Sequence, residues 1–256
     1  MLWKKGRRSD NVEDVRDQGT GGGGGMRLGG GKGLSLMAVV VIVGIGLLTG
    51  QDPMQILGQL SGQLTEQSSP QVTQPAGRAP AANDEQADFV RAILGDTEDT
   101  WRQVFQQAGR SYKDPTLVLF RGQINSACGF ATAASGPFYC PADQKVYLDM
   151  SFFQEMAQRF KAAGDFAQAY VIAHEVGHHV QTLLGVSSKM QMARQQGKRM
   201  EGDGGLLVRQ ELQADCLAGV WANLAQKRHN WLEAGDIESA LNAANAIGDD
   251  RLQQQS

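Results

Sequence analysis

The run His174-Glu175-Val176-Gly177-His178 contains residue types whose spacing could hold a metal ion. On an α-helix, side chains four residues apart lie one turn above each other, so both imidazoles can reach one ion. Neutral imidazole is a good donor to zinc, and Glu175 then lies beside the ion, where its carboxylate can take a proton from zinc-bound water. The spacing therefore predicts a zinc site that could hydrolyse a peptide bond.

A structural alternative exists for each histidine of this run. His174 and His178 could simply face a partner helix or solvent. The chain has only 4 histidines in 256 residues, which makes chance a poor explanation of the motif. His179 points about 100° away from His178 around the helix, so we expect it to have a structural role or to contact a metal ligand without binding the ion.

A catalytic zinc ion usually takes three protein ligands, so a third donor is needed. Glu211 and Asp215 lie four residues apart in a predicted helix over about residues 205–227, so both project from one face. We expect Glu211 to be the third ligand and Asp215 to hydrogen-bond the free nitrogen of a ligating histidine. The alternative is a solvated acidic face. It is disfavoured because the helix is apolar over much of its circumference, through Leu212, Cys216, Leu217, Val220, Trp221 and Leu224.

These residues are similar to the gluzincin pattern of zinc metallopeptidases. Over roughly residues 85–250, the chain resembles the putative neutral zinc metallopeptidase family of bacterial membrane-anchored proteins. The resemblance implies proteolytic activity, and it does not imply a physiological substrate. The motifs that carry it are Cys128-Gly129, Gly136-Pro137-Phe138-Tyr139-Cys140-Pro141, Asp143, Tyr147-Leu148-Asp149 and the H-E-V-G-H-H-V-Q run.

We expect an α+β, zincin-like fold for residues 85–250, mainly helical, with a small β-sheet above the active-site helix. In zincin folds, to which this order of elements is similar, the edge strand of the sheet binds the substrate in an extended form. Residues 187–205 are polar, and either close over the cleft or form an ordinary surface connection. Helices are predicted over residues 84–108, with a possible break at Gly95, and over 152–160, 170–184, 205–227 and 236–247; strands are predicted over 116–120, 138–140 and 145–149.

The N-terminal third of the chain differs from the rest in composition. Glycine dominates residues 19–33, so we expect residues 1–32 to form a flexible tail. Residues 33–50 carry no charge and are close to the length that crosses a bilayer, so we predict one transmembrane helix there. Residues 51–84 are rich in Gln, Ser, Pro, Gly and Ala, which is typical of an extended linker.

Basic residues set the predicted orientation of that helix. They cluster before residue 33, whereas the next one after the helix is Arg78. The positive-inside rule then places the N-terminus in the cytoplasm and the catalytic domain in the periplasm or at the cell surface. A cleaved signal peptide is the alternative, but the leader is long and no cleavage pattern follows Leu48. A buried core helix is disfavoured by the Gly-rich and polar sequences on either side.

The three cysteines divide into a pair and a single thiol. If the domain is extracytoplasmic, Cys128 and Cys140 can form a disulfide, which would contribute about 3 kcal/mol in the chain-entropy model. Zinc ligation by this pair is the alternative, but two cysteines at this spacing without a second pair do not match a structural zinc site. Cys216 lies in a predicted apolar helix and is expected to be a buried free thiol.

The residues together predict a single-span membrane metalloendopeptidase with one zinc ion per chain. Zinc held by His174, His178 and Glu211 would lower the pKa of bound water, and Glu175 would deprotonate it. His229 and Tyr170 are candidates for stabilising the oxyanion. The expected partners are a protein or peptide substrate and the membrane.

Two other functions fit the same residues. The zinc site could only stabilise a membrane-anchored binding or scaffold protein, although such a site gains nothing obvious from Glu175. A zinc amidase acting on cell-wall peptides would use the same metal chemistry. Nucleic acid is not an expected partner, because the sequence has no P-loop, dinucleotide fingerprint or basic patch, and its net charge of −3 selects no partner.

Overall fold

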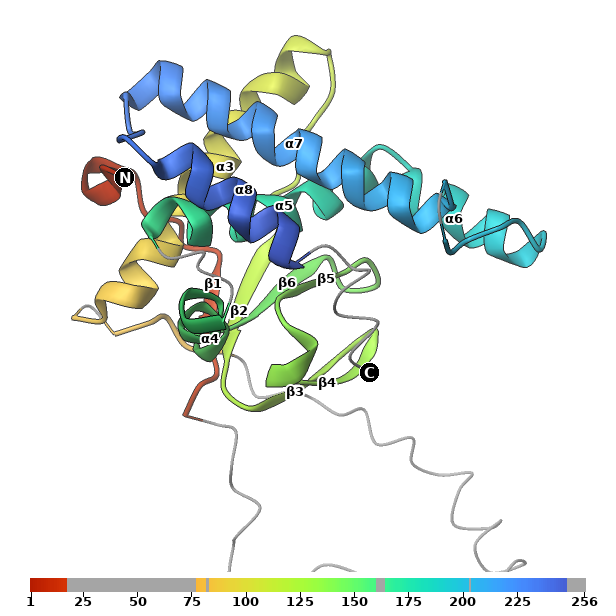
Figure 1. Cartoon of the computed structure of the whole chain (residues 1–256), viewed down its shortest axis with the longest axis horizontal. Coiled ribbons are helices and arrows are strands. Elements are labelled where there is room, and N and C mark those ends of the chain that lie inside the picture. The colour runs from red at the N-terminus through yellow and green to blue at the C-terminus, as the bar shows by residue number, and fades with distance from the viewer. Residues whose placement is uncertain (18–76, 82, 160–163, 203, 248–256) are drawn as a thin grey trace, which may run out of the picture. The chain divides into compact units, whose positions relative to one another are not determined.

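The computed structural model describes residues 1–17, 77–81, 83–159, 164–202 and 204–247. Four strands of this part of the chain form one sheet. Their order across the sheet is β1 (Val12–Asp14), β2 (Thr116–Phe120), β6 (Lys145–Asp149) and β5 (Phe138–Cys140). Strands β1, β2 and β6 run parallel, and β5 pairs antiparallel with β6 at the edge of the sheet (Figure 1).

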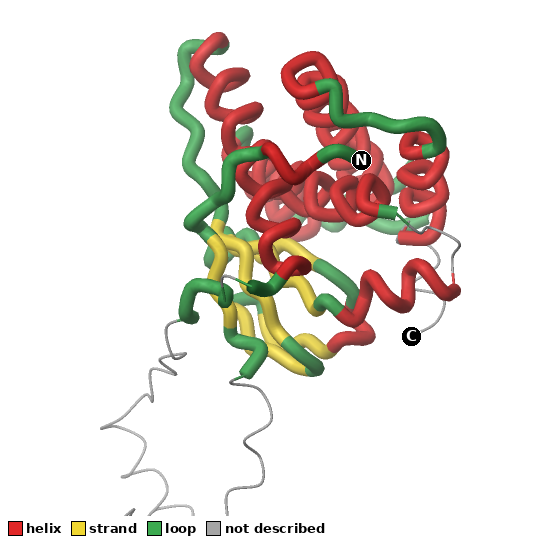
Figure 2. The backbone as a smooth tube through the Cα atoms, turned by 90° about the vertical axis from the view of Figure 1, so that its left-hand side faces the viewer, coloured by secondary structure: helices red, strands yellow, loops and turns green. Residues whose placement is uncertain are grey.

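Most of the helices lie on one side of this sheet, as Figure 2 shows. The shorter helices α4 (Ser151–Arg159) and α6 (Val186–Gln195) precede and follow the central helix in the chain. The predicted combination of helices with a small sheet is therefore confirmed. The central helix is α5 (Asp165–Leu183), which packs against α3 (Glu85–Gln107), α7 (Leu206–His229) and α8 (Asp236–Ile247).

Helix α5 lies at the centre because it is apolar on almost every side. Phe166, Val171 and Ile172 are buried on different faces of it, and a helix that is hydrophobic all round must be covered by other elements. His174 and Glu175 are buried along with these residues. The polar residues of the metal motif therefore lie on a helix that is held in place by packing on several sides.

Residues 1–17, here called the N-terminal segment, pack against the domain, whereas the sequence predicted a flexible tail for them. Strand β1 pairs with β2, with Val12 opposite Leu117. The buried Trp3 ring lies 5.2 Å from the Phe89 ring of α3, edge to face. The glycines over residues 19–33 are typical of a tail, but they begin only after this short strand has ended.

Gly95 allows the N-terminal segment to lie directly on α3. The sequence raised the possibility that this glycine ends the helix, but α3 continues through it. A Cβ atom at Gly95 would lie 2.7 Å from the carbonyl oxygen of Arg7, which is shorter than any real contact of this kind. The glycine therefore serves the close approach of two chain segments.

The predicted transmembrane helix over residues 33–50, the rest of the predicted tail and most of the predicted linker lie outside the described residues. Among the helices that the structure does describe, none is both long and apolar enough to span a membrane.

Helix α7 buries a different face from the one predicted. Its interface is made of small residues and one large ring. Leu212 is 62% exposed and Val220 is 38% exposed, and Cys216 is exposed, so the prediction of a buried thiol is wrong. Small side chains let neighbouring helices approach closely, which leaves the larger aliphatic side chains on the outer face. The buried residues of α7 are Ala214, Ala218, Trp221 and Ala225.

Helix α8 follows the same rule. Ala240 and Ala243 are buried, as expected of a helix that packs on α5. Ile237 and Leu241, which the sequence placed in the core, are exposed. The spacing of apolar residues therefore predicted the helix correctly but did not predict which of its faces is buried.

Residues 187–205, predicted only as a polar connection, include most of helix α6. Gly185 adopts the left-handed conformation, with φ of 80°, and turns the chain between α5 and α6. Glycine accepts this conformation without the steric cost that a side chain would add. The turn places α6 directly after the helix that carries the metal motif.

A second sheet, the hairpin of β3 (Gln123–Ser126) and β4 (Gly129–Thr132), is tied to the edge strand β5. The disulfide Cys128–Cys140, with Cα atoms 5.7 Å apart, makes this link and confirms the predicted pairing. Asp143 adds a second link, because it accepts hydrogen bonds from the Ala127 backbone N–H at 3.0 Å and the Tyr147 hydroxyl at 2.7 Å.

We expect removal of this disulfide to lower the free energy of unfolding by about 3 kcal/mol, because a short covalent loop is released in the unfolded chain. The paired variant Cys128→Ser with Cys140→Ser tests this by urea unfolding of the purified protein. Cys216→Ser is the matched control, since its thiol is free and exposed. Equal midpoints for the paired variant and the control would contradict the expectation.

Candidate metal centre

Helix α5 places His174 and His178 on one face, as their spacing predicts. Their ring centroids lie 4.8 Å apart and the rings are nearly perpendicular, at 87°. Both side chains are largely buried, so water competes little for their nitrogen atoms. The two imidazoles are therefore close enough to share one ion.

Helix α7 brings Glu211 to both imidazoles. Its Oε2 atom lies 3.2 Å from Nε2 of His174 and 3.2 Å from Nε2 of His178. Neighbouring ligand atoms around a tetrahedral zinc ion with bonds of about 2.05 Å lie roughly 3.3 Å apart. These three donors therefore have the types and the spacing that zinc requires, and they could hold a metal ion.

The second nitrogen of each imidazole is already occupied by an acceptor. Nδ1 of His174 lies 2.9 Å from Oδ1 of Asp215, as predicted for that carboxylate. Nδ1 of His178 lies 2.9 Å from the side-chain oxygen of Gln181. When Nδ1 carries the hydrogen, the lone pair of the neutral imidazole is on Nε2, so both Nε2 atoms are free to act as ligands.

Gln181 is a residue of the site that the sequence did not single out. It is fully buried, and its amide nitrogen donates to the carbonyl oxygen of Gln210 at 2.7 Å and to Oε1 of Gln213 at 3.0 Å. These bonds fix the amide so that its oxygen faces His178. Its position three residues after His178, on the same helix face, is the sequence feature that could have identified it.

His174 favours its protonated form, and Glu211 favours its ionised form. Burial lowers the pKa of His174, but hydrogen bonds with Asp215 and Glu211 outweigh this and raise the pKa to about 10. Burial raises the pKa of Glu211, whereas hydrogen bonds with His174 and His178 lower it to about 2. At neutral pH an ionised carboxylate therefore faces a protonated imidazole, and a cation that binds there must displace protons.

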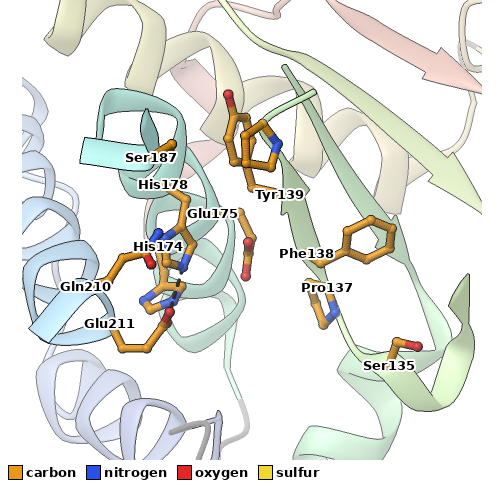
Figure 3. A pocket seen from close by; sticks show the side chains of 11 residues that line it. Ser135, Pro137, Phe138, Tyr139, His174, Glu175, His178, Ser187, Gln210 and Glu211 are labelled. Carbon is orange, nitrogen blue, oxygen red and sulfur yellow. Dashed lines mark hydrogen bonds and ion pairs between the residues drawn. The ribbon is translucent and has the colours of Figure 1, made fainter. Parts of the chain in front are cut away.

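Glu175 lies beside this cluster without belonging to it. Its side chain is buried, burial raises the pKa of its carboxyl group, and the Tyr139 backbone N–H donates a hydrogen bond to it. Figure 3 shows the Glu175 carboxylate between the imidazoles and strand β5. A cavity of about 260 Å³ opens there, with Pro137 and Phe138 among the residues of its opposite wall. A carboxylate in this position can exchange protons with a molecule in the cavity.

The structure separates the two candidates for oxyanion stabilisation. The Tyr170 hydroxyl donates to Asp215, so it lies next to the site. His229 is at the other end of α7, 229 − 211 = 18 residues beyond Glu211, which is about 27 Å along a helix. There it hydrogen-bonds Asp96 at 2.7 Å. The suggestion of His229 is therefore wrong.

His179 has a structural position, in agreement with the first of the two predicted roles. Its Nδ1 lies 3.0 Å from the Tyr139 hydroxyl and its Nε2 lies 2.6 Å from the carbonyl oxygen of Lys113. The ring is fully buried. His179 thus links α5 to strand β5 and to the chain before β2.

Gly177 explains why α7 comes close enough for Glu211 to reach both histidines. A Cβ atom at this position would lie 3.0 Å from the carbonyl oxygen of Ala214 and 3.2 Å from its Cα atom. Ala214 lies between Glu211 and Asp215 on α7. The backbone of α7 therefore rests on the helix turn that carries the motif.

We expect Gly177→Ala to weaken zinc binding by about 10- to 100-fold, the effect seen when the surroundings of metal ligands are disturbed. The added methyl group pushes α7, and with it Glu211, away from the histidines. Zinc affinity can be measured by competition with a chromophoric chelator. Gly219→Ala is the control, because no atom of another element lies within 4 Å of a Cβ placed there. Unchanged affinity in Gly177→Ala would contradict this role.

Comparisons with known proteins agree with the geometry. The family described as "Putative neutral zinc metallopeptidase" matches residues 1–256. The protein named "Uncharacterized protein YpfJ" of Escherichia coli strain K12 is 48% identical over 257 residues, which cover 100% of this chain and 86% of that protein. "Uncharacterized protein Rv2575" of Mycobacterium tuberculosis is 43% identical over 178 residues, which cover 66% of this chain and 59% of that protein. No solved structure matches the chain. The chain belongs to the putative neutral zinc metallopeptidase family.

Proposed function

We propose that the protein is a zinc metallopeptidase that binds one zinc ion per chain and hydrolyses peptide bonds. One observation carries this proposal. The Nδ1 atoms of His174 and His178 are both bonded to acceptors, and their Nε2 atoms converge with the Glu211 carboxylate beside a cavity. The chain belongs to a family that is described as a zinc metallopeptidase family, which supports the same function.

Zinc held by these three side chains would polarise the substrate carbonyl and lower the pKa of a water molecule. Glu175 takes a proton from the attacking water and returns it to the nitrogen of the leaving amine. Its buried position raises the pKa of its carboxyl group, which favours accepting that proton, and the Tyr139 N–H holds the carboxylate in place. Asp215 keeps His174 in the correct tautomer.

The substrate would bind along strand β5, in a zincin-like arrangement. Among the described strands, β5 is paired on one side only, with β6. Pro137, Phe138 and Tyr139 line the metal-site cavity. An unpaired strand edge offers N–H and C=O groups to an extended peptide, which can add as another strand. This geometry favours peptides in extended conformation over folded segments.

We also propose that residues 33–50 attach the protein to a membrane, since this stretch is apolar and carries no charge. The Cys128–Cys140 disulfide favours the periplasmic or extracellular side for the catalytic domain, because such bonds persist in oxidising compartments.

Incubating the full-length, zinc-loaded chain with casein and with murein peptides tests the function. Cleavage of casein that stops when a chelator removes the zinc is the expected result. Cleavage of murein peptides alone would favour the zinc amidase. A zinc-loaded protein that cleaves neither would favour the binding or scaffold protein.

A further inference from the structure

A second cavity adjoins the metal-site cavity, beside α6 and the beginning of α7. It has a volume of about 220 Å³. It shares Pro141, Ser187 and Gln210 with the metal-site cavity. Because the two cavities have lining residues in common, they are direct neighbours, and a peptide held at the metal centre would pass close to the second cavity.

The lining of this second cavity is mainly apolar. Met190, Met200 and Leu207 form much of the wall, and methionine side chains adapt to differently shaped apolar groups. A cavity holds a water molecule once it has about 10–15 Å³, so the volume here suits a large side chain. Among the described residues that line it, Arg194 is the one with a charge.

We propose that this cavity is a specificity pocket for a large apolar substrate side chain next to the scissile bond. The inference rests on the proposed peptidase function. Burial against methionine and leucine favours Leu, Met or Phe, whereas the positive charge of Arg194 disfavours Lys and Arg. Since one methylene group changes kcat/KM by about 10- to 200-fold in such pockets, leucine is preferred to alanine by at least this factor.

Two matched variants test the pocket. Met190 lines the cavity, whereas Met192, on the same helix, is 51% exposed and does not line it. With peptides that differ only in one residue beside the cleaved bond, Met190→Trp is expected to lower kcat/KM for leucine about 10- to 200-fold relative to alanine. Met192→Trp keeps the selectivity of the unchanged protein. Equal leucine preference in both variants would overturn the pocket.

A binding measurement separates this inference from the peptidase proposal. In the full-length protein with ¹³C-labelled methionine methyl groups, N-acetyl-leucinamide is expected to shift the signals of Met190 and Met200 and to leave Met192 unchanged. N-acetyl-glycinamide should shift none of them. These shifts in a protein that cleaves no peptide would refute the peptidase and retain the pocket. Cleavage with no shift at Met190 or Met200 would refute the pocket and retain the peptidase.

A different observation concerns the compartment of the N-terminal segment. Its strand β1 is paired with β2, which is an inner strand of the sheet. At the last residue of β1, the Asp14 N–H donates to the carbonyl oxygen of Arg78 at 2.7 Å, and the Arg78 N–H donates to the Asp14 carbonyl oxygen at 3.3 Å. Residues 14 and 78 therefore lie side by side.

Two arginines of this segment, Arg7 and Arg8, form ion pairs within the fold. Glu98 of α3 is fully buried, and it accepts hydrogen bonds from Arg7, from the Ser9 hydroxyl at 2.6 Å and from the Asn11 amide at 2.7 Å. Arg8 pairs with Asp88 of α3 at 2.7 Å. A buried carboxylate that loses its partners is strongly destabilising. These arginines therefore hold the segment on α3, and the positive-inside rule cannot count them as free charges.

We infer that residues 1–17 and residues 77–247 lie in the same compartment. Hydrogen-bonded strands cannot be separated by a bilayer, so the chain between them crosses a membrane an even number of times or not at all. A single crossing at residues 33–50, with the N-terminus in the cytoplasm and the catalytic domain outside, is incompatible with the β1–β2 pairing.

Thiol labelling in intact bacterial cells tests this inference with the full-length chain. Asp10→Cys, combined with Cys216→Ser, reports on the N-terminal segment, because the Asp10 side chain is 96% exposed. The native Cys216 thiol, which is free and exposed, reports on the domain. A membrane-impermeant maleimide is applied before and after permeabilisation, and labelling of the purified proteins confirms that both thiols react.

Both thiols are expected to give the same pattern, either labelled before permeabilisation or protected until then. Labelling of one thiol and protection of the other would overturn the shared compartment. Intact-mass measurement of the labelled proteins must find residues 1–17 on the same chain as Cys216, and their removal from the mature protein would overturn it as well.

Discussion

Replacing Glu175 by glutamine is expected to lower the rate of peptide cleavage by about 10²- to 10⁴-fold, the usual contribution of general acid–base catalysis. The amide has nearly the same shape as the carboxylate but cannot accept the proton of the attacking water. Glu175 is not among the three side chains that could hold the ion, so the zinc content should stay the same. Cleavage of an unstructured protein such as casein and zinc content by mass spectrometry are measured on the same sample.

The control for this variant is Glu238→Gln, an exposed glutamate on α8. It makes the same chemical change away from the metal centre and should retain the activity of the unchanged protein. If Glu175→Gln cleaved casein at the normal rate, Glu175 would not be the base. If Glu175→Gln lost its zinc, the carboxylate would instead take part in holding the ion.

Replacing Glu211 by alanine is expected to have the largest effect on metal content. It removes the one donor that α7 supplies within 3.2 Å of both Nε2 atoms. Supporting residues around a metal site change affinity by about 10- to 100-fold, and loss of a ligand should exceed this range. Zinc affinity measured by chelator competition checks the result, and cleavage should disappear with the zinc.

Asp215→Asn makes a graded comparison for the Glu211 variant. Asp215 touches the Nδ1 atom of His174, not the position where the ion would lie. Its loss should weaken zinc binding by about 10- to 100-fold, less than the loss of Glu211. If Glu211→Ala bound zinc as tightly as Asp215→Asn, Glu211 would not be a ligand.

The candidate site was largely predictable because its main parts are local in sequence. Residues four apart on one helix must share a face, which is sufficient to pair His174 with His178 and Glu211 with Asp215. This spacing did not predict that α7 packs against α5. It depends on a glycine, Gly177, that lets two backbones come close, and the sequence alone did not show what would lie opposite it.

The parts of the fold that were missed depend on contacts between distant segments. The N-terminal segment resembles a charged tail because Arg7 and Arg8 have no acidic partner nearby in sequence. Their partners, Glu98 and Asp88, lie on α3. The outer faces of α7 and α8 were placed in the core because their leucines and isoleucine outweigh their alanines on any hydrophobic scale. Close helix packing instead selected the alanines.

The central claim is that side chains from α5 and α7 hold one zinc ion together. Anomalous diffraction at the zinc absorption edge, from crystals of the full-length protein, tests it most directly. We expect one anomalous peak per chain at about 2.0–2.2 Å from His174 Nε2, His178 Nε2 and a Glu211 oxygen. A peak elsewhere in the molecule, or zinc between the two histidines with Glu211 turned away from it, would contradict this account.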